Sequence, residues 1–126
     1  AATAAIAPQI NSGGVVASIS SIIGLAPMAQ AQSYSASKAA LHSAIQSYRA
    51  ILAQKNIASL GIYPGPIDTD MAKEFAMEKN DVHQTAKNIL TSIAAGDEYI
   101  FPDPMSEQMG ALYLDNAVAL EKAFQQ

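Results

Sequence analysis

The chain has 126 residues, of which 50% are hydrophobic and 14% are charged, so it is long enough for one domain with a buried core and too short for two ordinary domains. Its net charge of -4 gives no electrostatic reason to expect nucleic acid or an anionic membrane as a partner, and no apolar run approaches the roughly 18 residues of a membrane-spanning helix. The absence of cysteine excludes a disulfide framework and a thiolate metal site, and it is compatible with the reducing cytoplasm, where we expect the protein to be located.

The beginning of the sequence predicts the end of a helix followed by a strand. Residues 1–10 have a helical pattern, which a turn at residues 11–14 closes. Residues 15–20, VVASIS, form a short β-branched run that is typical of a strand buried on both faces. Residues 22–32 contain a glycine and a proline and show no period, so we expect a loop there.

A long helix is predicted from about Ser33 to Gln54, with Ser33 as its N-cap and Asn56 just beyond its end. Its apolar residues recur at helical spacing, and they are Leu41, Ala44, Ile45, Tyr48, Ile51 and Leu52. Residues 57–62 then predict a second buried strand, which the turn Pro64-Gly65-Pro66 ends abruptly.

The rest of the sequence predicts helices around one more strand. A third helix, ending near Gly96, is indicated by apolar residues at helical spacing, namely Val82, Ala86, Ile89, Leu90 and Ile93. Residues 98–101 predict a short third strand, and residues 105–114 and 116–125 predict two short helices. Strands that alternate with helices imply parallel pairing with helical crossovers, which is the α/β class.

Three residues carry the chemistry that the sequence suggests: Ser21, Tyr34 and Lys38. A lysine one helical turn after a tyrosine places its ammonium beside the phenol and lowers the proton affinity of the phenol. A serine at the end of the preceding strand can hydrogen-bond a carbonyl in the same small volume. A tyrosine and a lysine at this spacing are also an ordinary surface pair on a helix, but open α/β sheets bind ligands beyond the carboxyl ends of their strands. These groups could reduce a ketone or oxidise an alcohol, provided that something supplies the hydride.

The sequence resembles the C-terminal half of a short-chain dehydrogenase/reductase, a family with a single Rossmann-type domain that uses NAD or NADP. The resemblance covers about residues 10–72 and rests on the segments GGVVASISS, YSASKAAL and IASLGIYPGPIDTDM, which match the family in type, order and spacing. It implies an α/β fold, namely the C-terminal half of a Rossmann-type doubly wound parallel sheet with flanking helices. Residues 1–126 would then be a single partial domain, the catalytic and substrate half of such a dehydrogenase.

The resemblance also implies a role for each matching residue. Tyr34 would be the general acid in reduction and the general base in oxidation, and Lys38 would assist it and hydrogen-bond the nicotinamide ribose. Ser21 would hold the substrate oxygen, with Ser20 as the alternative if the register shifts by one residue. The residues that would line the nicotinamide are Pro64, Gly65, Ile67 and Thr69. In this family the long helix, here residues 33–54, commonly forms a dimer interface, so a homo-oligomer is implied.

Two parts of the family pattern are missing from these residues. The glycine-rich phosphate loop, Thr-Gly-x-x-x-Gly-x-Gly after the first strand, occurs nowhere in the sequence, and neither does the residue that would select NAD or NADP. Asn11 lies only ten residues before Ser21, in a turn, so the role of the family's structural asparagine is not assigned to it. We therefore expect activity to require the N-terminal half of the Rossmann-type fold.

The other chemically interesting residues favour structural roles. His42 falls on the polar side of the predicted long helix and His83 near a helix start, and both are predicted to be solvated. Asp68 and Asp70 are predicted to cap a helix, because no further ligands accompany them to form a metal site. Four residues are predicted to be core or interface residues, and they are Met105, Met109, Leu112 and Leu114.

Two functions are compatible with the sequence. The first is an oxidoreductase that transfers a hydride between NAD(P) and a small carbonyl or alcohol substrate, with Tyr34 as the acid or base. The alternative is a truncated, non-enzymatic relic that acts through self-association, because three strands and their helices leave one sheet edge and one helix face uncovered. No residue of the sequence is diagnostic of a particular substrate.

Overall fold

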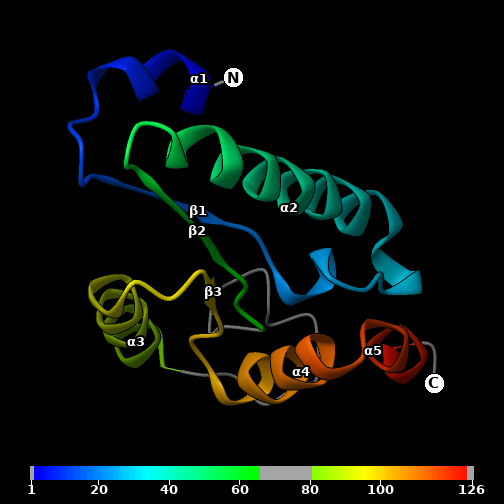
Figure 1. The fold of residues 1–126 in the computed structure, drawn as a ribbon. Coiled ribbons are helices and arrows are strands. Elements are labelled where there is room, and N and C mark those ends of the chain that lie inside the picture. Colours follow the sequence, from blue (N-terminus) through cyan, green and yellow to red (C-terminus); the bar gives the residue numbers. More distant parts are fainter. Residues whose placement is uncertain (1, 66–80, 125–126) are drawn as a thin grey trace.

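The computed structural model describes residues 2–65 and 81–124, and its strands form one parallel sheet. The strand order in the sheet is β1 (Val15–Ile19), β2 (Ala58–Ile62), β3 (Tyr99–Ile100). The described helices are α1 (Ala2–Ile6), α2 (Gln32–Ala53), α3 (Val82–Ala95), α4 (Pro104–Asp115) and α5 (Ala117–Phe124), with short 3-10 helices η1 (Ala7–Gln9), η2 (Ile22–Gly24) and η3 (Ala29–Ala31). Figure 1 shows α1 and α2 on one face of the sheet and α3 on the other. The predicted α/β class and parallel pairing are confirmed.

The first face of the sheet is covered by α2, whose apolar side packs largely as its spacing predicted. Ile45 and Leu52 are buried, and Leu52 packs with Ala7 and Ile57 in one core cluster. Ile51 instead leaves 54% of its surface exposed, so this position of the predicted apolar set lies outside the core.

The helix α2 begins without a side-chain cap and is followed by a turn in which one residue has a left-handed conformation. The prediction of Ser33 as the N-cap is wrong, since α2 begins at Gln32, directly after η3, and Ala31 before it makes no side-chain cap bond. Beyond the other end, Asn56 has a φ of 55°, a left-handed conformation that asparagine tolerates better than most residues. The Asn56 carbonyl accepts a hydrogen bond of 2.7 Å from the Gly13 amide, which joins this turn to the turn before β1.

The opposite face of the sheet is covered by α3. Ile89 and Ile93 of this helix pack against the strands, and the buried strand residues in this cluster are Leu60, Ile62 and Ile100. The helix ends at Gly96, as predicted, with a left-handed φ of 78°.

One face of β1 lies open in the described structure. Val15 is 43% exposed and Ile19 is 60% exposed, so the prediction that this strand is buried on both faces is wrong here. The physical reason is its position, because β1 is an edge strand of the described sheet and the α3 residues Ile89 and Ile93 pack against β2 and β3. The connection after β1 is also more regular than the predicted loop, since it contains η2 and η3.

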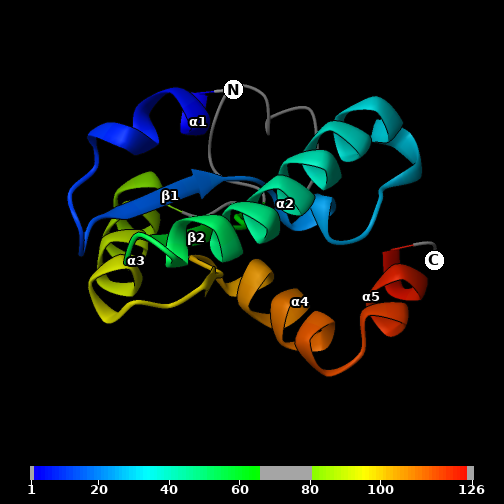
Figure 2. The same cartoon turned by 45° about the horizontal axis from the view of Figure 1, so that its top comes forward.

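The last two helices confirm the predicted helical stretches. Leu120 of α5 is fully buried, whereas Leu114 at the end of α4, predicted as a core or interface residue, is 61% exposed and is not part of the core. Figure 2, together with Figure 1, shows α5 beside the connection that leads from β1 into α2. Over residues 2–65 and 81–124, no helix has both the length and the apolar character needed to cross a membrane.

Candidate active site

The carboxyl ends of β1 and β2 lie side by side, which brings two predicted site segments together. Ile19 is paired with Ile62, and the ladder continues beyond the strands, with the Ser20 amide donating to the Ile62 carbonyl at 2.7 Å. The Ile22 amide then donates to the Pro64 carbonyl at 3.0 Å. The serines that follow β1 and the Pro-Gly turn that follows β2 are therefore neighbours.

The two serines after β1 have different surroundings. Ser20 is only 2% exposed, and its hydroxyl donates to the Lys38 carbonyl at 3.1 Å. Ser21 is partly exposed, and its hydroxyl lies 3.5 Å from the Pro64 carbonyl and accepts from the Ile23 amide at 3.3 Å. Of the two, Ser21 has the hydroxyl that a ligand could reach, and Ser20 has the hydroxyl that holds α2 to the end of β1.

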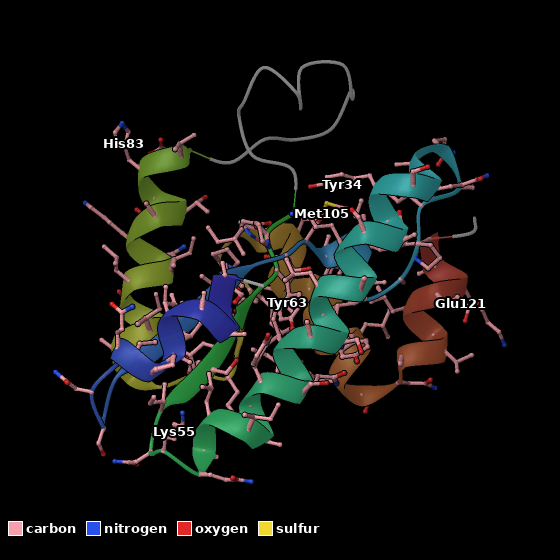
Figure 3. The ribbon with its side chains drawn as sticks, turned by 90° about the horizontal axis from the view of Figure 1, so that it is seen from above. Tyr34, Lys55, Tyr63, His83, Met105 and Glu121 are labelled. Atoms are coloured by element: carbon pink, nitrogen blue, oxygen red, sulfur yellow. The ribbon has the colours of Figure 1, made fainter. Side chains whose placement is uncertain are left out.

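Tyr34 and Lys38 lie in the first turns of α2, one helical turn apart. The Tyr34 side chain is 43% exposed, and the Lys38 ammonium lies 5.5 Å from the centroid of the Tyr34 ring. In Figure 3, Tyr34 lies at the end of α2 opposite Lys55, while Tyr63 lies beneath the middle of the helix. The sequence prediction that the ammonium stands beside the phenol agrees with this geometry.

The start of α2 is fixed by contacts with the connection that follows β1. The Met28 amide donates to the Ser35 hydroxyl at 3.2 Å, and Ser35 is buried. Gly24 approaches the helix so closely that a Cβ at this position would lie 2.8 Å from the Lys38 carbonyl oxygen. Since Ser20 bonds the same carbonyl, the turns that carry Tyr34 and Lys38 are held against the end of β1.

The predicted nicotinamide-lining residues are only partly within the described structure. Pro64 and Gly65 are partly exposed and lie just beyond β2. Ile67 and Thr69 lie outside the described residues, as do Asp68 and Asp70. Within the described ranges, no group of three or more histidines, cysteines or carboxylates is placed to hold a metal ion.

No role was predicted for Asp103, whose buried carboxylate joins two elements. Its Oδ2 accepts from the Gly65 amide at 2.8 Å, and its Oδ1 accepts from the Ser106 amide at 2.9 Å. Asp103 therefore caps α4 and holds the turn after β2 at the same time. The pattern Asp-Pro-x-Ser could have indicated the helix cap, but nothing in the sequence connects Asp103 to Gly65.

The prediction that His42 is solvated is wrong. Its Nδ1 lies 2.7 Å from the Tyr63 hydroxyl, and its Nε2 lies 3.4 Å from the Tyr113 hydroxyl. Burial lowers the pKa of His42 from its usual 6.5, and the nearby charge of Arg49 lowers it further. Burial also raises the pKa of Tyr63 well above its usual value. His42 lies three residues before the buried Ile45 on the same helix, so the helical spacing could have placed it toward the sheet.

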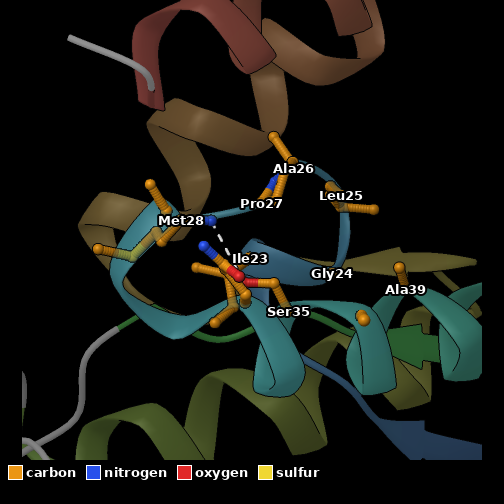
Figure 4. Close-up of a pocket in the computed structure, with 11 residues that line it drawn as sticks. Ile23, Gly24, Leu25, Ala26, Pro27, Met28, Ser35 and Ala39 are labelled. Atoms are coloured by element: carbon orange, nitrogen blue, oxygen red, sulfur yellow. Dashed lines mark hydrogen bonds between the residues drawn. The ribbon is translucent and has the colours of Figure 1, made fainter.

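A pocket of about 400 Å³ lies between α2 and the connection after β1 (Figure 4). Its lining comes mostly from small and apolar residues, which include Leu25, Pro27, Met28 and Ala36. Ser21, Tyr34 and Lys38 are not among the residues that line it. This pocket and the three candidate reacting groups are therefore different places on the molecule.

Comparison with known proteins points to one family. The sequence profile described as short chain dehydrogenase matches residues 1–80, whereas no curated protein sequence matches the chain. A solved short chain dehydrogenase from Burkholderia cenocepacia J2315, in complex with NADP, has a TM-score of 0.83 and 24% identity over 98% of this chain and 53% of its own. The alcohol dehydrogenase from Comamonas testosteroni that is specific for bulky-bulky ketones has a TM-score of 0.67 and 20% identity over 94% of this chain and 46% of its own. The chain thus spans about half the length of both structures.

Proposed function

Because this chain belongs to the short-chain dehydrogenase family, we propose that it carries the catalytic and substrate half of an oxidoreductase. The reaction would transfer a hydride between NAD or NADP and a small carbonyl or alcohol compound. The observation that most supports this proposal is the position of Tyr34 and Lys38, which are held against the end of β1 by the bond from Ser20 to the Lys38 carbonyl. The partly exposed Ser21 hydroxyl lies at the same end of that strand.

The proposed chemistry assigns one task to each of these side chains. Ser21 would hydrogen-bond the substrate oxygen, for which its hydroxyl must leave the long, weak contact with the Pro64 carbonyl. Tyr34 would give its phenolic proton to that oxygen in reduction and take it back in oxidation. Lys38, whose ammonium lies 5.5 Å from the centroid of the Tyr34 ring, would assist this proton transfer and hydrogen-bond the nicotinamide ribose.

The chain's residues fit the nicotinamide part of such a cofactor, which would supply or accept the hydride. Lys38, Pro64 and Gly65 are all partly exposed beyond the carboxyl ends of the strands, where open α/β sheets bind ligands. Ile67 and Thr69 would complete this lining. The residues that hold the pyrophosphate and adenosine would come from elsewhere, because the sequence contains no glycine-rich phosphate loop.

The experiment that tests this proposal uses the protein expressed from its complete reading frame. Nicotinamide cofactor binding and the reduction of a panel of ketones are measured for the wild type, Tyr34→Phe and Tyr48→Phe. Tyr48 lies on the same helix and packs in the core cluster of Leu52, so its variant is the matched control. Tyr34→Phe should lower kcat by about 10²-fold or more, while Tyr48→Phe should retain activity. A protein without cofactor binding, or an active Tyr34→Phe variant, would refute the proposal.

Self-association without catalysis is the second candidate, and two observations favour it. The apolar side chains of Val15 and Ile19 are exposed on β1, which is an edge strand of the described sheet. Ile51 is 54% exposed on α2, the helix for which a dimer interface is expected. Exposed apolar side chains on an unpaired strand and on a helix are typical of surfaces that associate.

A further inference from the structure

Asp103 is a buried carboxylate that lies between β3 and α4. It is only 2% exposed, and each of its two side-chain oxygens accepts a different backbone hydrogen bond. Oδ1 accepts from Ser106 in the first turn of α4 at 2.9 Å, and Oδ2 accepts from Gly65 beyond β2 at 2.8 Å. A buried carboxylate requires such partners, and hydrogen bonds to an ionised acceptor are stronger than those between neutral groups.

The Pro64–Gly65 peptide group is held from its other side as well. The Pro64 carbonyl accepts from the Ile22 amide at 3.0 Å and lies 3.5 Å from the Ser21 hydroxyl. The carbonyl oxygen and the amide hydrogen of a trans peptide point in opposite directions within one rigid plane. The orientation of the carbonyl that faces Ser21 is therefore coupled to the bond between Gly65 and Asp103.

The approach of Asp103 to this peptide depends on glycine. A Cβ at position 65 would lie 2.8 Å from the Asp103 Oδ1 and 3.4 Å from the Met105 Cβ. Both atoms belong to the segment that begins α4, so the first turn of this helix packs directly on Gly65. The end of β2 and the start of α4 thus form one unit through a contact that spans 38 residues of sequence.

We propose that Asp103 is a positioning residue for the reaction centre. Its Oδ2 fixes the plane of the Pro64–Gly65 peptide, and through that plane it sets the carbonyl that faces the Ser21 hydroxyl and the turn on which the nicotinamide would lie. This inference rests on the proposed function for its catalytic consequence. The hydrogen bond from the Gly65 amide to the Asp103 carboxylate is a property of the fold and can be tested separately.

The test compares Asp103→Asn with Ser106→Ala in the protein expressed from its complete reading frame. Asparagine can still accept from the Ser106 amide, since it is a good N-cap residue, but its amide NH₂ then faces the Gly65 N–H and cannot accept from it. Ser106→Ala removes the other half of the capping box and leaves both Asp103 oxygens in place. The pair thus separates the Gly65 contact from the capping of α4.

Two readouts decide the proposal. Hydrogen exchange at the Gly65 amide should accelerate at least about tenfold in Asp103→Asn and stay near wild type in Ser106→Ala. The KM for the nicotinamide cofactor should rise about tenfold or more in Asp103→Asn alone, even where the two variants lose similar thermal stability. Equal exchange in both variants, or equal KM values, would mean that Asp103 only caps α4. If the wild type binds no nicotinamide, the proposed function fails. The hydrogen-exchange rate of the Gly65 amide still confirms or refutes its hydrogen bond to Asp103.

Discussion

The imidazole Nδ1 of His42 lies 2.7 Å from the hydroxyl of Tyr63, a residue with no exposed surface. This hydrogen bond joins the middle of α2 to the residue that directly precedes the Pro64–Gly65 turn. Two further tyrosines surround the pair, since Tyr113 lies 3.4 Å from the imidazole Nε2 and the Tyr99 ring stacks on the Tyr63 ring at 5.8 Å. The helix that carries Tyr34 is therefore fixed to the sheet both at its first turns and near its middle.

The His42 contact predicts that stability depends on pH below neutrality. Burial, and secondarily the charge of Arg49, lower the pKa of His42 from its usual 6.5. Because the unfolded chain then binds this proton more strongly than the folded protein, the free energy of unfolding should fall as pH drops below 6.5. The decrease in the free energy of unfolding should level off once the pH is below the pKa of His42 in the folded protein.

Urea denaturation at several pH values checks this expectation. The urea midpoint of the wild type should fall more steeply on acidification than that of His42→Gln, which can still hydrogen-bond Tyr63 but does not titrate. His83→Gln removes an imidazole that is exposed, so this control should retain the wild-type curve. Parallel curves for the wild type and His42→Gln would contradict the prediction.

Gly61 makes room for the Tyr63 ring. The two residues lie on the same face of the strand, and a Cβ at position 61 would overlap the Tyr63 hydroxyl and come within 2.7 Å of two ring carbons. Gly61→Ala should therefore lower the free energy of unfolding by about 1–3 kcal/mol, the usual cost of overpacking a core. The measurement is chemical denaturation of a double-mutant cycle with Tyr63→Ala. If Gly61→Ala lowers the free energy of unfolding as much in the Tyr63→Ala background as in the wild type, the steric explanation is wrong.

The two serines after β1 should separate stability from activity. Ser20→Ala removes a buried hydroxyl that bonds the Lys38 carbonyl, and it should cost about 1 kcal/mol of unfolding free energy. Ser21→Ala removes a partly exposed hydroxyl with a long contact to Pro64, so it should cost less stability but lower kcat by about 10²-fold. Thermal unfolding and steady-state kinetics on both variants are the checks. The opposite pattern would transfer the proposed substrate contact to Ser20.

The exposed side of α2 should determine the oligomeric state. Ile51→Lys introduces a charge on the outer face of this helix and should shift the sedimentation coefficient toward that of a monomer. Leu90→Lys is the matched control, because Leu90 is 67% exposed on α3, on the other face of the sheet. A wild type that is already monomeric, or an equal effect of both changes, would contradict an interface formed by α2.

The sequence alone determined the parts of this protein that depend on local pattern. The β-branched run at residues 15–20, the helical spacing after Ser33 and the glycine at position 96 predicted elements that the structure contains. The segments GGVVASISS, YSASKAAL and IASLGIYPGPIDTDM indicated the family, because they match it in type, order and spacing along the chain.

Only the tertiary structure decided which polar groups are buried and what they bond. Asp103 and Gly65 are 38 residues apart, and no periodicity connects them, because their contact depends on how the start of α4 packs against the end of β2. The burial of His42 likewise depends on a tyrosine that lies 21 residues further along the chain and reaches back over Gly61. A hydrogen bond across the fold forms only where packing brings donor and acceptor to within about 3 Å, and sequence spacing contains no information on that distance.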